Sequence, residues 1–232
     1  MKLKQTHADN PAHGLERMAF FSDAVFAIAI TLLVIEIKVP EVAHPYTDAA
    51  FLEALNERIP HFIGFFVSFF AIGLFWASHH RAFDCARHFS PKLFVPNLML
   101  LCAIAAMPFF TAFSAEHFGY RVPTAFYCGW MIVISLCNIM VQRILTAPPV
   151  VGEQVPEEQR RAIRQRGLSA LLGSVTAFAM SLFIPALGQV MLITIPLWRL
   201  LLNRIAPVHA DPRRKSMPRV TPENSEPSPE IR

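Results

Sequence analysis

The chain has 232 residues, of which 53% are hydrophobic and 16% charged, and its mean hydropathy is +0.39. A soluble domain usually carries about 25% charged residues, so this composition argues against a soluble protein and indicates a polytopic membrane protein. The formal net charge is +4. In a membrane protein such an excess is a topology signal, so nucleic-acid binding is not expected.

Six apolar segments approach the length of about 20 residues that is needed to cross a hydrocarbon core. They lie at residues 18–37, 59–79, 93–114, 123–145, 167–184 and 188–205. The last two form one nearly unbroken run, in which a turn is expected at residues 185–189. We therefore predict an all-α fold with a six-helix transmembrane channel domain at 15–206. It lies between a cytoplasmic tail at 1–14 and a disordered, proline-rich cytoplasmic tail at 207–232.

The basic residues are distributed unevenly between the two sides of these spans. All Lys and Arg residues except Lys38, Arg58 and Arg121 lie before the first span, near or after the end of the sixth, or close to the segments joining spans two to three and four to five. The positive-inside rule then places both termini in the cytoplasm, with the chain crossing the inner (plasma) membrane several times.

The first span carries polar residues near its beginning. A carboxylate inside a membrane costs about 2.5–3.5 kcal/mol on insertion scales, so Asp23 needs a polar partner. The second span ends with Trp, two His and Arg, and the third begins with an Asn, so the topology brings these side chains to one depth. We predict a structural polar network made of Arg17, Ser22, Asp23, Trp76, His79, His80 and Asn97.

Other uses of this cluster stay open. Asp23 and the His79/His80 pair could be the coupling site of a proton- or cation-coupled secondary transporter. His80, Asp84 and His88 repeat at intervals of four residues on one helical face, which would suit a proton relay or a metal site, or a metal-dependent enzyme that also uses His79. We favour the structural network, with no metal and no catalytic residue, because none of the common catalytic motifs occurs. The residues Cys85, Cys102, Cys128 and Cys137 form no CxxC pair and are interpreted as packing residues.

A helical projection divides the first span into two faces. One stripe contains Phe21, Ala24, Val25, Ile28, Thr31, Leu32 and Ile35. The far side contains Asp23, Phe26, Ile30, Leu33 and Ile37. The projection alone does not say which stripe faces what.

The pattern Arg17-x-x-x-Phe21-Ser22-Asp23, followed by AVFAIAITLLVIEI, resembles the first helix of the transmembrane protein 175 family of potassium-permeable channels in its bacterial single-repeat form. Further positions in the second and third spans are similar to that family, namely Trp76, His79, His80, Asn97, Pro108, Phe109 and Thr111. The resemblance covers the first three spans. The last three match in number and topology only.

This resemblance implies a homotetramer in the lipid bilayer, with four copies of the first span around a central pore. It assigns pore and selectivity positions to Ile28, Thr31, Leu32 and Ile35. Potassium would be the permeant ion, and no cofactor is implied. An aliphatic constriction does not replace the hydration shell of an ion, so only a modest preference for potassium over sodium is expected.

Overall fold

The computed structural model describes residues 11–42 and 44–205. Within these ranges the chain is helical and contains no strand, which confirms the predicted all-α fold. The helices are α1 (Pro11–Leu32), α2 (Asp48–Glu57), α3 (Ile59–Asp84), α4 (Phe94–Ala105), α5 (Met107–Glu116), α6 (Arg121–Leu145), α7 (Glu157–Phe183), α8 (Pro185–Gly188) and α9 (Thr194–Ile205). Three 3₁₀ turns join or extend them: η2 (Leu33–Glu36), η3 (Pro91–Leu93) and η4 (Val190–Ile193).

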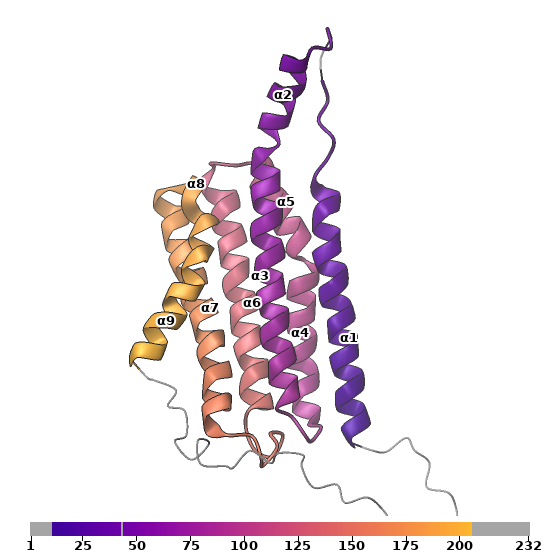
Figure 1. The fold of residues 1–232 in the computed structure, drawn as a ribbon, viewed down its shortest axis with the longest axis vertical. Coiled ribbons are helices and arrows are strands. Elements are labelled where there is room, and N and C mark those ends of the chain that lie inside the picture. Colours follow the sequence, from indigo (N-terminus) through magenta and orange to yellow (C-terminus); the bar gives the residue numbers. More distant parts are fainter. Residues whose placement is uncertain (1–10, 43, 206–232) are drawn as a thin grey trace, which may run out of the picture.

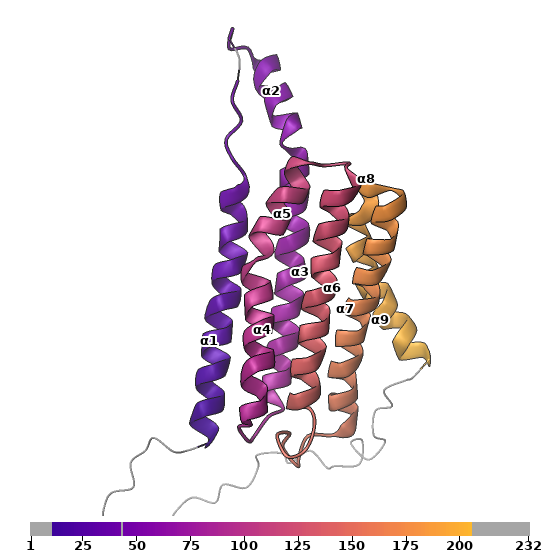
Figure 2. The same cartoon turned by 180° about the vertical axis from the view of Figure 1, so that it is seen from behind.

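Six helical segments are long and apolar enough to cross a membrane, as the hydropathy pattern predicted. They are His13–Glu36, Ile59–Asp84, Pro91–Glu116, Arg121–Leu145, Glu157–Phe183 and Pro185–Ile205. Figures 1 and 2 show them side by side, running alternately up and down, so that α1 begins at the end of the bundle toward which α9 runs. The predicted tail at 207–232 and residues 1–10 of the other tail lie outside the described residues.

Two connecting segments contain helices that the hydropathy pattern did not predict. The charged residues 157–166, which precede the fifth predicted span, form the beginning of α7, and this helix continues from Glu157 into the span without a break. Two acidic residues in its first turn favour the helix start, and Arg160 pairs with Glu157 at 3.1 Å. The helix α2 was not predicted at all; Thr47 caps its first turn by accepting a hydrogen bond from the Ala50 amide at 3.2 Å.

The third span is broken near its middle, between α4 and α5 at Ala106. Pro108 explains the break, because proline has no amide hydrogen to donate to the carbonyl one turn earlier. A neighbouring carbonyl, that of Ala103, accepts a hydrogen bond from Trp130 Nε1 of α6 at 2.8 Å. The bundle thus supplies a donor beside the interrupted helix, as membrane-embedded backbone requires.

The predicted reversal between the last two spans lies at Pro185, where α8 begins and the chain turns back (Figure 1). The returning helix α9 packs closely along α7. A Cβ atom on Gly173 of α7 would collide with the Ile195 side chain of α9, so glycine permits this approach. By contrast, a Cβ atom on Gly73 of α3 would meet no heavy atom within 4 Å, so no close approach requires glycine there.

Within this bundle α1 packs against α3 and α4 at one side, and α6 lies among α4, α5 and α7. A buried hydroxyl cluster joins α3, α5 and α6, in which Ser68 Oγ lies 2.7 Å from Thr111 Oγ1 and 3.0 Å from the Tyr127 hydroxyl. The side of α1 away from α3 and α4 remains uncovered in the subunit.

Candidate functional site

The first span, which consists of α1 and its 3₁₀ extension η2, has one covered and one uncovered face, and these are called the two faces of α1. Ile28, Thr31, Leu32 and Ile35 are all exposed in the subunit, with Ile28 58% and Ile35 68% exposed. The opposite face is buried and carries Ser22, Phe26, Ala29 and Leu33. The structure therefore places all four predicted pore positions on the exposed side of the first span.

Thr31 is the polar member of the uncovered face. Its hydroxyl donates a hydrogen bond to the Ile28 carbonyl at 2.9 Å. This local bond satisfies the hydroxyl hydrogen inside the helix, as is common for Thr in membrane helices. The oxygen lone pairs stay available, so the side chain can present an acceptor toward whatever lies outside the face.

The buried face of α1 is joined to α3 and α4 by a chain of hydrogen bonds. His79 Nε2 donates to Asn97 Oδ1 at 2.9 Å, and Asn97 Nδ2 donates to Ser22 Oγ at 3.0 Å. Ser22 Oγ in turn donates to the Met18 carbonyl at 2.8 Å. His79, Asn97 and Ser22 are all buried, and Phe26 lies against the His79 ring with centroids 5.4 Å apart. Three helices thus share one satisfied polar chain.

A second, more accessible branch starts one residue further along α1. Trp76 Nε1 donates to Asp23 Oδ1 at 2.8 Å, and His80 Nδ1 lies 3.8 Å from Asp23 Oδ2. The Asp23 side chain is 32% exposed, so the carboxylate is at the edge of the interface between α1 and α3. His80 Nε2 also lies 3.9 Å from Asp84 Oδ1.

The structure brings six of the seven predicted network residues into these two branches. Arg17 is the exception: it is exposed, and in the part of the chain that the structure describes it makes no ion pair or hydrogen bond with the others. Sequence reasoning missed the Ser68–Thr111–Tyr127 cluster. Its signals in the sequence were Ser68, a serine inside a span that is otherwise rich in phenylalanine, and Thr111, which was noted only for its similarity to the family.

The alternative interpretation of this cluster as a metal site requires several ligating side chains to lie close together. No group of three or more His, Cys, Asp or Glu side chains within residues 11–42 and 44–205 lies close enough together to hold a metal ion. Cys85, Cys128 and Cys137 are buried free thiols, and Cys102 is an exposed one.

Residues 17–108 match the family model described as the endosomal/lysosomal potassium channel TMEM175. This segment contains every residue of the uncovered α1 face and of the polar network. A potassium channel of Streptomyces collinus is 37% identical over 124 residues, which are 52% of this chain and 59% of that protein. A potassium channel of Chamaesiphon minutus is 34% identical over 155 residues, which are 65% of this chain and 75% of that protein.

A solved structure agrees with the sequence matches. The crystal structure of a lysosomal potassium-selective channel TMEM175 homolog from Chamaesiphon minutus superposes with a TM-score of 0.70 and 28% identity. The superposition covers 82% of this chain and 99% of that one. The family and these relatives are named for ion channels and not for enzymes. The chain belongs to the TMEM175 family.

Proposed function

We propose that this chain forms a potassium-permeable cation channel in which four copies of α1 surround a central pore. The observation that carries the proposal is the division of α1 into two faces. One face is bonded to α3 and α4, and the other presents Ile28, Thr31, Leu32 and Ile35, which remain exposed in the subunit. The names of the family and of the bacterial relatives support potassium as the permeant ion.

Several copies are needed because one helix face cannot enclose a pathway. In a closed cyclic tetramer each exposed residue of α1 becomes a ring, so four side chains define a constriction at each level. The subunits would cross the plasma membrane with both termini in the cytoplasm, on the side where most Lys and Arg residues lie.

The aliphatic rings account for a modest ion preference. They offer no oxygen to replace the hydration shell, so an ion that loses water more easily passes more easily, and a narrow ring also closes by dewetting. The Thr31 hydroxyls would add one layer of acceptors between the rings. Their hydrogen is engaged with the Ile28 carbonyl, which leaves the oxygen free to face a cation.

The polar network would hold α1 at a fixed rotation, so that the same stripe always faces the axis. Asp23 lies about 140° from Ile28 around the helix at about 100° per residue, and its oxygens are directed to Trp76 and His80 of α3. We therefore assign Asp23 to positioning α1 and not to the ion pathway.

The first test is electrical. Purified protein reconstituted in planar bilayers should carry a passive current, and its reversal potential with potassium on one side and sodium on the other should indicate a modest preference for potassium. A stoichiometric exchange of cations for protons would contradict the channel. It would favour a secondary transporter that uses Asp23 and His80, whose side chains already lie together.

The second test locates the pathway. In a background with Cys102 changed to Ser, Ile35→Cys should react with a charged methanethiosulfonate added from the outer side and lose current. Val122→Cys is the matched control, because Val122 is also exposed but begins α6 at the same end of the bundle. Block of Val122→Cys with no effect on Ile35→Cys would contradict an α1-lined pore.

A further inference from the structure

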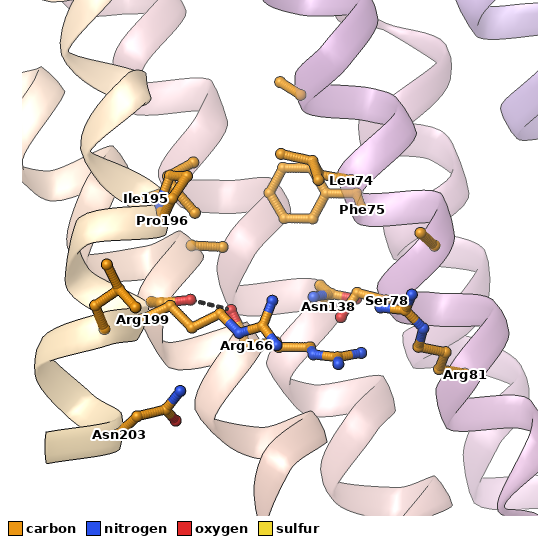
Figure 3. Close-up of a pocket in the computed structure, with 15 residues that line it drawn as sticks. Leu74, Phe75, Ser78, Arg81, Asn138, Arg166, Ile195, Pro196, Arg199 and Asn203 are labelled. Carbon is orange, nitrogen blue, oxygen red and sulfur yellow. Dashed lines mark hydrogen bonds between the residues drawn. The ribbon is translucent and has the colours of Figure 1, made fainter.

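A pocket of about 370 Å³ lies between α3, α6, α7 and α9, and no residue of α1 lines it (Figure 3). It is therefore separate from the uncovered α1 face and from the polar network. Its position, on the side of the bundle where α9 folds back over α7, depends on the reversal at Pro185. The proposed conduction role uses none of its residues.

Three arginines from three helices line this pocket: Arg81 of α3, Arg166 of α7 and Arg199 of α9. No acidic side chain lines it, and none of the three takes part in an ion pair with another residue in the described ranges. Cations at membrane depth usually pair or mark a binding site, because an unpaired charge there is costly. Three convergent guanidinium groups without a carboxylate provide a site for an anion.

A buried amide gives independent support. Asn138 of α6 is only 1% exposed, lines the pocket, and has no hydrogen-bond partner among the described residues for either its Nδ2 or its Oδ1 atom. The buried Nε of Arg166 also has no partner within these residues. Each unsatisfied buried polar group costs about 1–3 kcal/mol, so the two free donors, Asn138 Nδ2 and Arg166 Nε, favour a bound acceptor in the pocket.

The pocket changes polarity along the membrane normal. Figure 3 shows Leu74, Phe75, Ile195 and Pro196 at one level, with Asn138 and the arginines at the level nearer the end where α7 begins. That end carries the basic connecting segments, which the positive-inside rule assigns to the cytoplasm. An apolar part toward the membrane centre and a cationic part toward the cytoplasm match the order of acyl chain and headgroup in an inner-leaflet lipid.

We propose that this pocket binds the phosphate of an anionic lipid, with the guanidinium groups of Arg81, Arg166 and Arg199 and the Asn138 amide holding the headgroup. The apolar wall formed by Phe75 and Ile195 favours a lipid over free phosphate, because inorganic phosphate has nothing to place against it. The bound lipid would join α9 to α3, two helices that are distant in the sequence.

The experiment measures binding to the intact protein by native mass spectrometry, with dioctanoyl-phosphatidylglycerol, dioctanoyl-phosphatidylcholine and inorganic phosphate as separate probes. Phosphatidylglycerol should bind more tightly than phosphatidylcholine, and inorganic phosphate should bind weakly. Arg199→Gln should weaken phosphatidylglycerol binding at least about tenfold, the loss expected for one charge-assisted contact.

Arg204→Gln is the matched control, since Arg204 is an exposed arginine on the same helix that does not line the pocket. Arg81→Gln, on a different helix, repeats the test if Arg199→Gln disturbs α9, and gel filtration checks that both variants keep the wild-type assembly. Equal binding of phosphatidylglycerol to wild type, Arg199→Gln and Arg81→Gln would overturn the proposal. Arginine-dependent binding of inorganic phosphate without phosphatidylglycerol binding would overturn the lipid assignment. The measurement requires no ion flux, so its failure and that of the channel proposal are distinguishable.

Discussion

Replacing Asp23 tests whether this carboxylate positions α1 or faces the ions. Asp23→Ala removes the acceptor for Trp76 Nε1, a hydrogen bond of 2.8 Å to a charged group. Such bonds contribute about 1.5–3 kcal/mol, and the lower half of that range applies because the Asp23 side chain is 32% exposed. His80 Nδ1 lies 3.8 Å from Asp23 Oδ2, and because the His80 side chain is half-exposed, this ion pair adds at most about 1 kcal/mol of stability.

These contributions give an expected loss of about 2–3 kcal/mol for Asp23→Ala, less than the roughly 3–5 kcal/mol of a fully buried pair. Asp23→Asn keeps an oxygen toward Trp76 and loses only the charge, so about 1–1.5 kcal/mol is expected. For a domain of this size 1 kcal/mol corresponds to about 2–4 °C in Tm. Gel filtration of heated samples should therefore resolve the order of thermal stability, in which wild type is the most stable, Asp23→Asn is intermediate and Asp23→Ala is the least stable.

Glu16→Ala is the control, because Glu16 is an exposed acid on the same helix. It should leave the Tm unchanged. Assembled Asp23→Asn channels should retain near-normal potassium preference in bilayers. The reasoning is refuted if Asp23→Asn assembles with wild-type stability but loses its cation preference, since the carboxylate would then form a charge ring in the pathway.

Three further substitutions address other parts of the site. We predict that Ile28 forms the narrowest ring of the proposed pore, so Ile28→Asn should let water persist there and raise conductance while lowering selectivity; unchanged bilayer currents would place the constriction elsewhere. Thr31→Val should lower the potassium-to-sodium permeability ratio measured from reversal potentials, and an unchanged ratio would leave only the helix-internal bond to Ile28. Asn97→Leu leaves His79 Nε2 without its acceptor and should cost about 1–3 kcal/mol, seen as a lower Tm of the purified protein, whereas a Tm equal to wild type would mean that the buried chain adds no stability.

Hydropathy predicted the six spans because crossing a hydrocarbon core imposes a length and a composition on each segment. It failed at the start of α7 and at α2, where helices carry charged residues outside the core. Helix formation there follows from capping and from acidic residues in the first turn, which a hydropathy scale does not measure. The break before Pro108 falls inside one apolar segment, so hydropathy does not reveal it, and the donor that Trp130 places beside it comes from α6.

The network could be predicted as a group sharing one depth, because topology fixes depth. Which partners meet depends on helix rotation, which the sequence left open. Trp76 and His80 face Asp23, whereas His79, one residue away from His80, points to Asn97. Arg17 lies on the same helix as Ser22 and Asp23, but within the described residues it makes no hydrogen bond or ion pair with the network. The arginine pocket was missed because Arg81, Arg166 and Arg199 are separated along the sequence by most of the bundle and converge only when α9 folds back.

Within the described part of the chain, the hydrogen bonds that join α1 to the bundle come from a single turn, at Ser22 and Asp23. Beyond that turn α1 is held by Phe26, Ala29 and Leu33, whose apolar contacts have no preferred direction. Hydrogen bonds therefore fix the direction of α1 at one level only, and a tilt of the helix would turn about Ser22. With a rise of about 1.5 Å per residue, a rigid tilt of about 5° around Ser22 displaces Ile28 by about 0.8 Å and Ile35 by about 1.7 Å. In the proposed pore such a tilt would therefore move the ring at Ile35 about twice as far as the ring at Ile28.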